Sequence, residues 1–280
     1  MKVTSVTLSR FSGDLQMAGR ADGTIQQYVA SVRKFEDLLG GDLAEASQED
    51  IRRWVDLLRG RAIGASSLGL HYSALKFLYG RTLGQPEQVA WITIPKAKAH
   101  LPSILARVEV KRLLEGFTHA RYRTFFTLIY ATGLRIHEAC QLETRDIDAM
   151  QQVIHVRDGK GGKDRMVPLS AKLYGTLRAY YKHERPPHPW VFTSNAGTPL
   201  CAETARRALL CAAAASGIGK VVGPHMLRHA FATHLLEAGT DLRKIQVILG
   251  HSSIQSTQIY TQVVASQIAA VRSPFEDLPD

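Results

Sequence analysis

Hydrophobic residues recur at helical spacing near the start of the chain. Between residues 24 and 39 they fall on one helix face, at Ile25, Tyr28, Val32, Phe35, Leu38 and Leu39. Thr24 is the expected N-cap of this helix, and Gly40 and Gly41 are expected to end it. The pattern therefore predicts an amphipathic helix with one face in a core.

Three more helices are predicted around this one. Ser47 should begin a helix because Glu49 and Asp50 follow it, and carboxylates are favoured in a first helical turn. Its inward positions are Ile51, Trp54, Val55 and Leu58. Another helix should begin at Ser66 or Ser67, with Leu70, Leu75 and Leu78 inward, and a shorter one should run from Phe11 to Met17. Residues 1–87 are thus predicted to form a helical domain.

Residues 88–105 read as a linker between two domains. Pro95 and Pro102 interrupt regular structure there, and Lys96, Lys98 and His100 lie between them. A basic connector of this kind could let two bodies close on opposite sides of a duplex.

The second domain, residues 106–262, mixes helical and strand patterns. Helices are predicted at 108–116, 120–132, 171–181, 202–215, 225–238, 242–249 and 254–260. Strands are predicted at 153–156 and 165–167 around a hairpin turn at 159–162, and Val191 with Phe192 could form an edge strand. The fold class is therefore mainly α: a helical N-terminal domain and an α+β domain with a small sheet. The tail, residues 263–280, ends in an acidic, proline-rich segment.

Charge points to a polyanionic partner. The 280-residue chain carries a net charge of +10 and has a pI of about 9.6, which favours nucleic acid over a basic protein merely kept soluble by charge. The candidate DNA contacts on the first helices are Arg33, Lys34, Arg52, Arg53, His71 and Lys76, although basic residues on a helix more often coat a solvated face. The candidates further along are Lys96, Lys98, Lys163 and Arg165.

Cysteine usage and hydropathy give no sign of an extracellular or membrane protein. Cys140, Cys201 and Cys211 have no paired spacing, so neither a disulfide framework nor a zinc site is indicated, and all three are expected in apolar packing. The N-terminal sequence lacks the apolar run of a signal peptide, and no segment is long enough to span a membrane. We expect a cytoplasmic protein without a membrane partner.

The last fifth of the chain carries the clearest chemical pattern, in His225, Arg228, His251 and Tyr260. His225 and Arg228 are three residues apart behind Pro224, so both can face one phosphate. Tyr260 is a possible nucleophile. His229, four residues after His225, raises a zinc alternative, but neither an HExxH pattern nor a third ligand is present.

Two residues far upstream could join this group. Arg135 follows the helix break at Thr132 and Gly133, where a guanidinium could lie near a helix N-terminus, or it could be a surface arginine paired with Glu138. Lys160 lies in the predicted hairpin turn. A P-loop is excluded because a strand, rather than a helix, is expected after Asp164.

Together these segments resemble one family. TGLRIHE, GKGGKDRMVPL, HMLRHAFATHLLEAG and LGHSSIQSTQIY, in this order, resemble the tyrosine recombinases, also called the phage integrase family. The resemblance covers Ala106 to Gln262, and the helical front half is loosely similar to the family's SAM-like core-binding domain. His137 departs from the pattern, where a small residue is common, and could alter packing or contact DNA.

The resemblance implies a role for each candidate. Tyr260 would attack the scissile phosphate and form a 3′-phosphotyrosyl link, and His225 would accept its proton. Arg135 and Arg228 would bind the non-bridging oxygens, which makes a metal or other cofactor unnecessary. Lys160 would protonate the leaving 5′-oxygen and His251 would donate to a phosphate oxygen, while Glu138 would buttress Arg135.

The resemblance also implies double-stranded DNA and a homotetramer on two recombination sites as partners. The tail after Tyr260 either docks on a neighbouring protomer or packs on its own domain. The compact chain, without an integron-type insertion between Val191 and Pro224, looks Xer-like and fits a nucleoid-associated protein in a bacterial, phage or transposon context. A DNA-binding protein that no longer cuts, and a type IB topoisomerase-like relaxing enzyme, are the alternatives.

Overall fold

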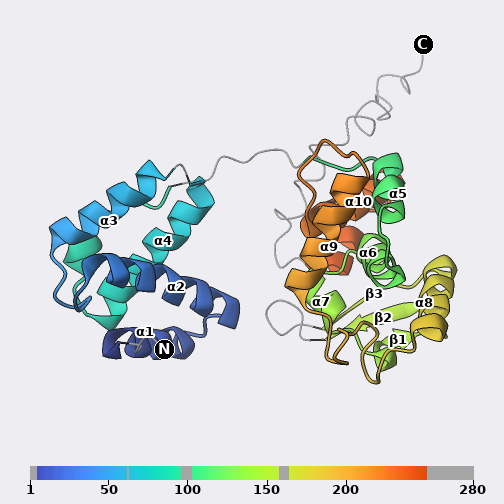
Figure 1. Ribbon diagram of the computed structural model, residues 1–280, viewed down its shortest axis with the longest axis horizontal. Coiled ribbons are helices and arrows are strands. Elements are labelled where there is room, and N and C mark those ends of the chain that lie inside the picture. Colours follow the sequence, from blue (N-terminus) through green and yellow to red (C-terminus); the bar gives the residue numbers. More distant parts are fainter. Residues whose placement is uncertain (1–4, 62, 96–102, 158–163, 251–280) are drawn as a thin grey trace, which may run out of the picture. The chain divides into compact units, whose positions relative to one another are not determined.

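A computed structural model describes residues 5–61, 63–95, 103–157 and 164–250 (Figure 1). The chain divides into two compact units, residues 1–100 and 101–280. Each unit has its own hydrophobic core within its described part. The fold class is mainly α, as predicted, with one small sheet in the second unit.

In the described part of the first unit, all regular structure is helical. Its elements are α1 (Val6–Met17), α2 (Asp22–Leu39), α3 (Gln48–Gly60), α4 (Ala65–Phe77), a π-helical turn (Leu78–Thr82) and a 3₁₀ turn (Pro86–Val89). The largest fully buried side chains of the core are aromatic: Phe11, Phe35, Trp54, Tyr72 and Tyr79. Phe35 stacks on Trp54 at 5.8 Å between ring centroids, which fixes α2 against α3.

Helix ends in this unit agree with the sequence only in part. The Ser47 hydroxyl caps α3, and the Asp50 carboxylate accepts the Ser47 backbone N–H at 3.0 Å, so the predicted start is confirmed as a capping box. Gly40 ends α2 in the left-handed region, at φ 70°. Thr24, however, lies inside α2, which begins at Asp22 because the first turn accommodates an acidic residue.

Three smaller expectations about the first unit were wrong. Helix α1 begins at Val6 rather than Phe11, since the Ser5 hydroxyl accepts the Leu8 N–H. Helix α4 begins at Ala65, just before the predicted serines. Leu38 is 40% exposed, because its neighbour Leu39 faces the core instead.

The start of the predicted linker belongs to the first core. Val89 at the end of the 3₁₀ turn and Ile92 just after it are buried in the core of the first unit. Leu105 is buried in the second core. Lys96 and Lys98 lie outside the described residues.

The second unit is built around α6 (Ala120–Thr132) (Figure 1). Its other α-helices, up to residue 250, are α5 (Arg107–Glu115), α7 (Ile136–Cys140), α8 (Ala171–Glu184), α9 (Ala202–Ala215), α10 (Pro224–Glu237) and α11 (Leu242–Leu249). Helix α6 contacts α10 and α8, and its Phe125, Phe126, Leu128 and Ile129 are fully buried. This central helix ends at the candidate site.

A three-stranded antiparallel sheet completes the second unit, in the order β1 (Ile147–Asp148), β2 (Val153–Val156), β3 (Arg165–Pro168). Ile154 pairs with both Ile147 and Val167. The two predicted strands are confirmed, β1 was missed, and the turn at 159–162 lies outside the described residues. Phe192 is buried but forms no strand, because its surroundings offer only isolated bridges.

Two cysteines differ from expectation. Cys140 is buried, but Cys201 and Cys211 are exposed, because α9 turns Ala205, Leu209 and Ala212 to the core instead. Among the described residues, no helix combines the length and apolar character needed to cross a membrane.

Candidate active site

The turn between α6 and α7 requires a glycine. Gly133 ends α6 with φ 69°, in the left-handed region. A Cβ there would lie 2.6 Å from Phe231 Cδ1 and 2.7 Å from Leu249 Cδ2, so a side chain would be both strained and crowded. The predicted helix break is confirmed. The turn brings Arg135 to the N-cap position of α7.

Arg135 and Glu138 form a close pair on α7. Arg135 Nη1 donates to Glu138 Oε1 at 2.8 Å, and the Arg135 backbone N–H donates to Oε2 at 2.7 Å. Arg135 Nη2 donates to the Gly250 carbonyl at 3.4 Å. Both interpretations of the sequence are therefore compatible: Arg135 is paired with Glu138 and also stands at a helix N-terminus.

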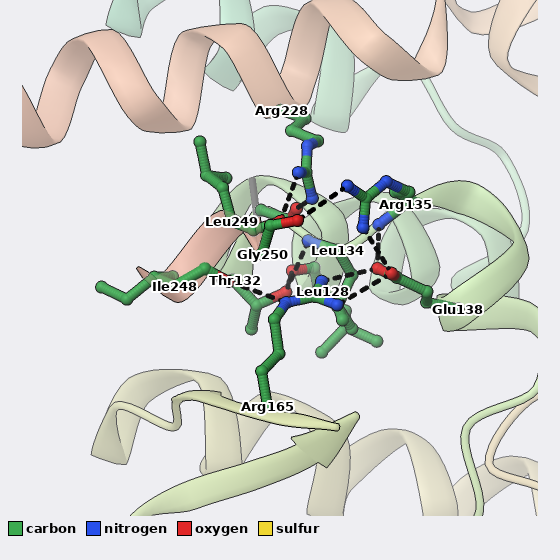
Figure 2. Close-up of polar contacts among 11 residues, drawn as sticks. Leu128, Thr132, Leu134, Arg135, Glu138, Arg165, Arg228, Ile248, Leu249 and Gly250 are labelled. Atoms are coloured by element: carbon green, nitrogen blue, oxygen red, sulfur yellow. Dashed lines mark hydrogen bonds and ion pairs between the residues drawn. The ribbon is translucent and has the colours of Figure 1, made fainter. Parts of the chain in front are cut away.

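The position of Arg165 in the structure does not fit the prediction that its side chain contacts DNA. Its side chain is only 7% exposed, because it turns inward from β3 (Figure 2). Nη1 donates to Glu138 Oε1 at 2.8 Å and Nη2 to Oε2 at 2.7 Å, and Nε donates to the Ile248 carbonyl at 2.9 Å. These bonds direct its guanidinium at the protein rather than at a ligand.

The charge of Glu138 is strongly stabilised. Burial would raise the pKa of this carboxyl, but the hydrogen bonds and positive charge of Arg165, together with the bonds from Arg135, lower it to about 2. Glu138 is therefore ionised at neutral pH, and two guanidinium groups share one carboxylate.

Arg228 lies on α10 and is only 4% exposed. Its Nη1 donates to the Gly133 carbonyl in a short hydrogen bond, and its Nη2 donates to the Leu249 carbonyl at 2.6 Å. Three successive carbonyls at the end of α11, those of Ile248, Leu249 and Gly250, thus accept from Arg165, Arg228 and Arg135 (Figure 2). Cations are favoured at this end of a helix.

His225 lies in the first turn of α10, one turn before Arg228. Its side chain is exposed, but the part of the ring that the protein covers loses hydration, which lowers the pKa of the imidazole below 6.5. The positive charges of Arg228 and Arg135 lower that pKa further. The ring is therefore mainly neutral at pH 7 and can accept a proton.

The described part of the chain offers no set of ligands for the zinc ion considered as an alternative. No group of three or more His, Cys, Asp or Glu side chains is placed there to hold a metal ion. His229 is partly buried, and burial, followed by the charges of His225 and Arg228, lowers the pKa of its imidazole. Two neighbouring histidines alone do not complete a tetrahedral site.

The remaining candidates divide into three groups. Lys160, Lys163, His251 and Tyr260 lie outside the described residues, as does the predicted helix at 254–260. Exposed candidates on α2 and α3 are Arg33, Lys34, Arg52 and Arg53, and Lys76 on α4 is partly buried.

His71 was wrongly expected on an exposed face. Its Nδ1 lies 2.6 Å from the Ser31 hydroxyl, and its ring meets Trp54 edge-on, so it joins α4 to the core. His137, in contrast, is exposed and lines a cavity of about 450 Å³ with Glu143, Arg145, His155 and Trp190. This exposure is compatible with the alternative that His137 contacts DNA.

Arg165 joins the candidate site through Glu138 in a way that the sequence analysis did not predict, although the sequence carried a signal for it. Alternate residues of a strand share a face, and Val167 on β3 is buried. Arg165 is two residues earlier and so points the same way. A buried arginine needs an acidic partner, which the sequence offered at Glu138.

The chain is also similar to known proteins along most of its length. The family model described as "Phage integrase family" matches residues 103–267, and "Phage integrase, N-terminal SAM-like domain" matches residues 8–88. Tyrosine recombinase XerA of Pyrococcus furiosus is 35% identical over 269 residues, covering 94% of this chain and 92% of the relative. Tyrosine recombinase XerD of Rhizobium meliloti is 35% identical over 274 residues, covering 89% and 88%.

The fold also recurs among solved structures. A lambda integrase tetramer bound to a Holliday junction matches with a TM-score of 0.70 and 21% identity, covering 88% of this chain and 76% of that one. The motif order, the family match and the two XerA and XerD relatives agree with one another. The chain therefore belongs to the phage integrase family, as a tyrosine site-specific recombinase of the Xer-like type.

Proposed function

We propose that the chain cuts and rejoins DNA at a specific site, with Tyr260 as the nucleophile. One observation carries the proposal: the guanidinium groups of Arg135 and Arg228 meet at the carbonyls of Leu249 and Gly250, directly before His251. Arginine binds phosphate through paired N–H donors and keeps its charge at all relevant pH values. A phosphodiester at this place would meet two cations from separate helices.

Bond making and breaking follow from these groups. The Tyr260 oxygen forms a bond to phosphorus while the bond from phosphorus to the 5′-oxygen breaks, which leaves a 3′-phosphotyrosyl link and a 5′-hydroxyl. Arg135 and Arg228 neutralise the charge that builds up on the non-bridging oxygens. A second strand's 5′-hydroxyl then attacks the link, restores the phosphodiester and releases Tyr260. The energy of the broken bond is kept in the link, so no ATP is required.

Two proton transfers accompany cleavage. A tyrosine hydroxyl with a pKa of about 10 is protonated at neutral pH and must lose its proton on attack. His225 is the acceptor in this proposal, because the lowered pKa of its imidazole keeps the ring neutral. Lys160 gives a proton to the leaving 5′-oxygen, and His251 donates a hydrogen bond to a non-bridging oxygen. Glu138 holds Arg135 in position.

The assembly is proposed from the same chemistry. One protomer cuts one strand, so exchange between two duplexes needs four protomers, and the lambda integrase of the same fold is a tetramer on a Holliday junction. Residues 1–87 and 106–262 would grip the duplex through the exposed arginines of α2 and α3 and through the candidate active site. Residues 263–280 would dock on a neighbouring protomer. Because its substrate would be DNA, the protein would act in the cytoplasm.

The test is covalent capture. Duplexes bound by the purified protein are selected from a random pool, and a nick is placed near the expected cleavage point so that cut strands cannot rejoin. The wild-type protein should form a covalent adduct that survives denaturation. Tyr260→Phe should bind the duplex equally well and form no adduct. Tyr181→Phe, which changes an exposed tyrosine on α8, is the matched control and should still form the adduct.

Two other outcomes would redirect the proposal. Tight binding without any adduct on selected DNA would make the chain a DNA-binding protein that no longer cuts. Relaxation of a supercoiled plasmid that lacks the selected site would instead indicate a topoisomerase-like enzyme.

A further inference from the structure

Glu138 is saturated with hydrogen-bond donors. Its two oxygens accept from the Arg135 backbone N–H, Arg135 Nη1, Arg165 Nη1 and Arg165 Nη2, all at 2.7 or 2.8 Å. An ionised carboxylate offers about four acceptor positions. With these filled, Arg135 bonds the carboxylate through one guanidinium nitrogen, while its Nη2 turns to Gly250 (Figure 2).

The charges within this cluster do not cancel. Arg135 and Arg165 are both positive, and Glu138 is negative because its pKa lies near 2. The set therefore keeps one net positive charge. An isolated pair of Arg135 and Glu138 would be neutral overall and would attract a phosphate much more weakly.

We propose that Arg165 is a positioning residue that keeps Arg135 available to the scissile phosphate, by holding both oxygens of Glu138 and balancing its charge. Arg165 is 7% exposed and directs its donors at Glu138 and Ile248, so it acts through Arg135 rather than on DNA. Without it, Glu138 would accept both Nη groups of Arg135 as a bidentate pair. That geometry would turn Nη2 away from the end of α11 and would neutralise the cation. The inference rests on the proposed function.

The decisive experiment is a double-mutant cycle between Arg165 and Glu138. Arg165→Met removes the charge and the donors while keeping an unbranched side chain. Its single-turnover rate of adduct formation at saturating nicked duplex should fall about 10²-fold, the loss typical for one oxyanion donor. The affinity for DNA should stay within about threefold of the wild-type value, because the buried side chain of Arg165 does not contact the DNA backbone.

Adding Glu138→Gln to Arg165→Met should restore activity. With the carboxylate gone, Arg135 recovers its net charge, so the double variant should be within about tenfold of Glu138→Gln alone. If Arg165 only fills space, the second change cannot help, and the double variant would be at least as slow as Arg165→Met. Such a result overturns the inference. Arg178→Met, an exposed arginine change on α8, is the control for loss of positive charge and should leave the rate unchanged.

Folding is separated from positioning by two further measurements. Thermal unfolding of each variant is recorded, because Arg165→Met leaves Glu138 buried with fewer partners. If Arg165→Met does not fold, Arg165→Met/Glu138→Gln is compared with Glu138→Gln directly: a rate within about tenfold supports the inference, and a deficit of about 10²-fold at an equal melting temperature overturns it.

Failure of the proposed function would look different. A wild-type protein that forms no adduct on selected DNA removes the proposed function and this inference together. A wild-type adduct that Arg165→Met forms at the same rate removes the inference alone.

Discussion

Among the described glycines of the second unit, Gly133 combines a positive φ with the shortest contacts that an added Cβ would make. We consider Gly133→Ala, with Gly217→Ala as its matched control. Both glycines follow a helix with positive φ, 69° and 63°, so an alanine meets a similar left-handed backbone penalty of about 1–2 kcal/mol at each. The restricted unfolded chain offsets about 0.4–1 kcal/mol of that penalty at both positions.

Only Gly133 adds a packing cost. An added Cβ at Gly217 has nothing within 4 Å, whereas at Gly133 it meets Phe231 at 2.6 Å and Leu249 at 2.7 Å. Overfilling a packed site typically costs about 1–3 kcal/mol. Gly133→Ala should therefore lower the free energy of unfolding of the second unit by about 1–3 kcal/mol more than Gly217→Ala does.

The assay is urea unfolding, with hydrogen exchange and mass spectrometry used to assign the transition to residues 103–250. Because the two units can unfold separately, a single global midpoint would not isolate the effect. Equal destabilisation by the two variants, within about 0.5 kcal/mol, would refute the reasoning, since it would mean that Phe231 and Leu249 yield without cost.

Three other predictions follow from named contacts. Ser170→Ala removes the hydroxyl that accepts the Leu173 N–H at 3.2 Å and should cost about 1 kcal/mol in urea unfolding, whereas Ser170→Gly should cost only a few tenths. Tyr79→Phe leaves the Leu43 carbonyl without its buried 2.9 Å donor and should cost about 1–3 kcal/mol; no loss would mean that another donor replaces it. Because the pKa of Glu138 falls to about 2 in the folded state, its contribution is complete above the usual 4.5 and is lost as pH falls toward 2. Glu138→Gln should therefore flatten the acid side of the stability profile by up to about 3 kcal/mol, and an unchanged slope would contradict this.

Local features were predictable from sequence because their causes are local. The capping box of Ser47 and Asp50 and the pairing of Arg135 with Glu138 each connect residues three positions apart. The hydrophobic alternation of β2 and β3 likewise gave both strands.

Other features depend on contacts that one sequence does not reveal. His71 is drawn inward by Ser31, which lies 40 residues earlier, and Arg165 by Glu138, which lies 27 residues earlier. The partners of Arg228 are main-chain carbonyls, whose positions depend on how α6, α10 and α11 pack. Phe192 is as apolar as a strand residue, but a strand also needs a neighbour with free N–H and C=O groups.

The arginine bonds at the end of α11 also determine when the site can form during synthesis. The bond from Arg135 to Gly250 joins residues 115 apart, and the bond from Arg165 to Ile248 joins residues 83 apart. At about 5–20 residues per second, a ribosome needs about 6–23 s to travel from the first to the second of the more distant pair. Throughout that time Arg135 has been synthesised, but the end of α11 that accepts its hydrogen bond has not. Because such long-range contacts form late, a nascent or truncated chain ending before residue 248 has no assembled arginine cluster with which to hold a phosphate.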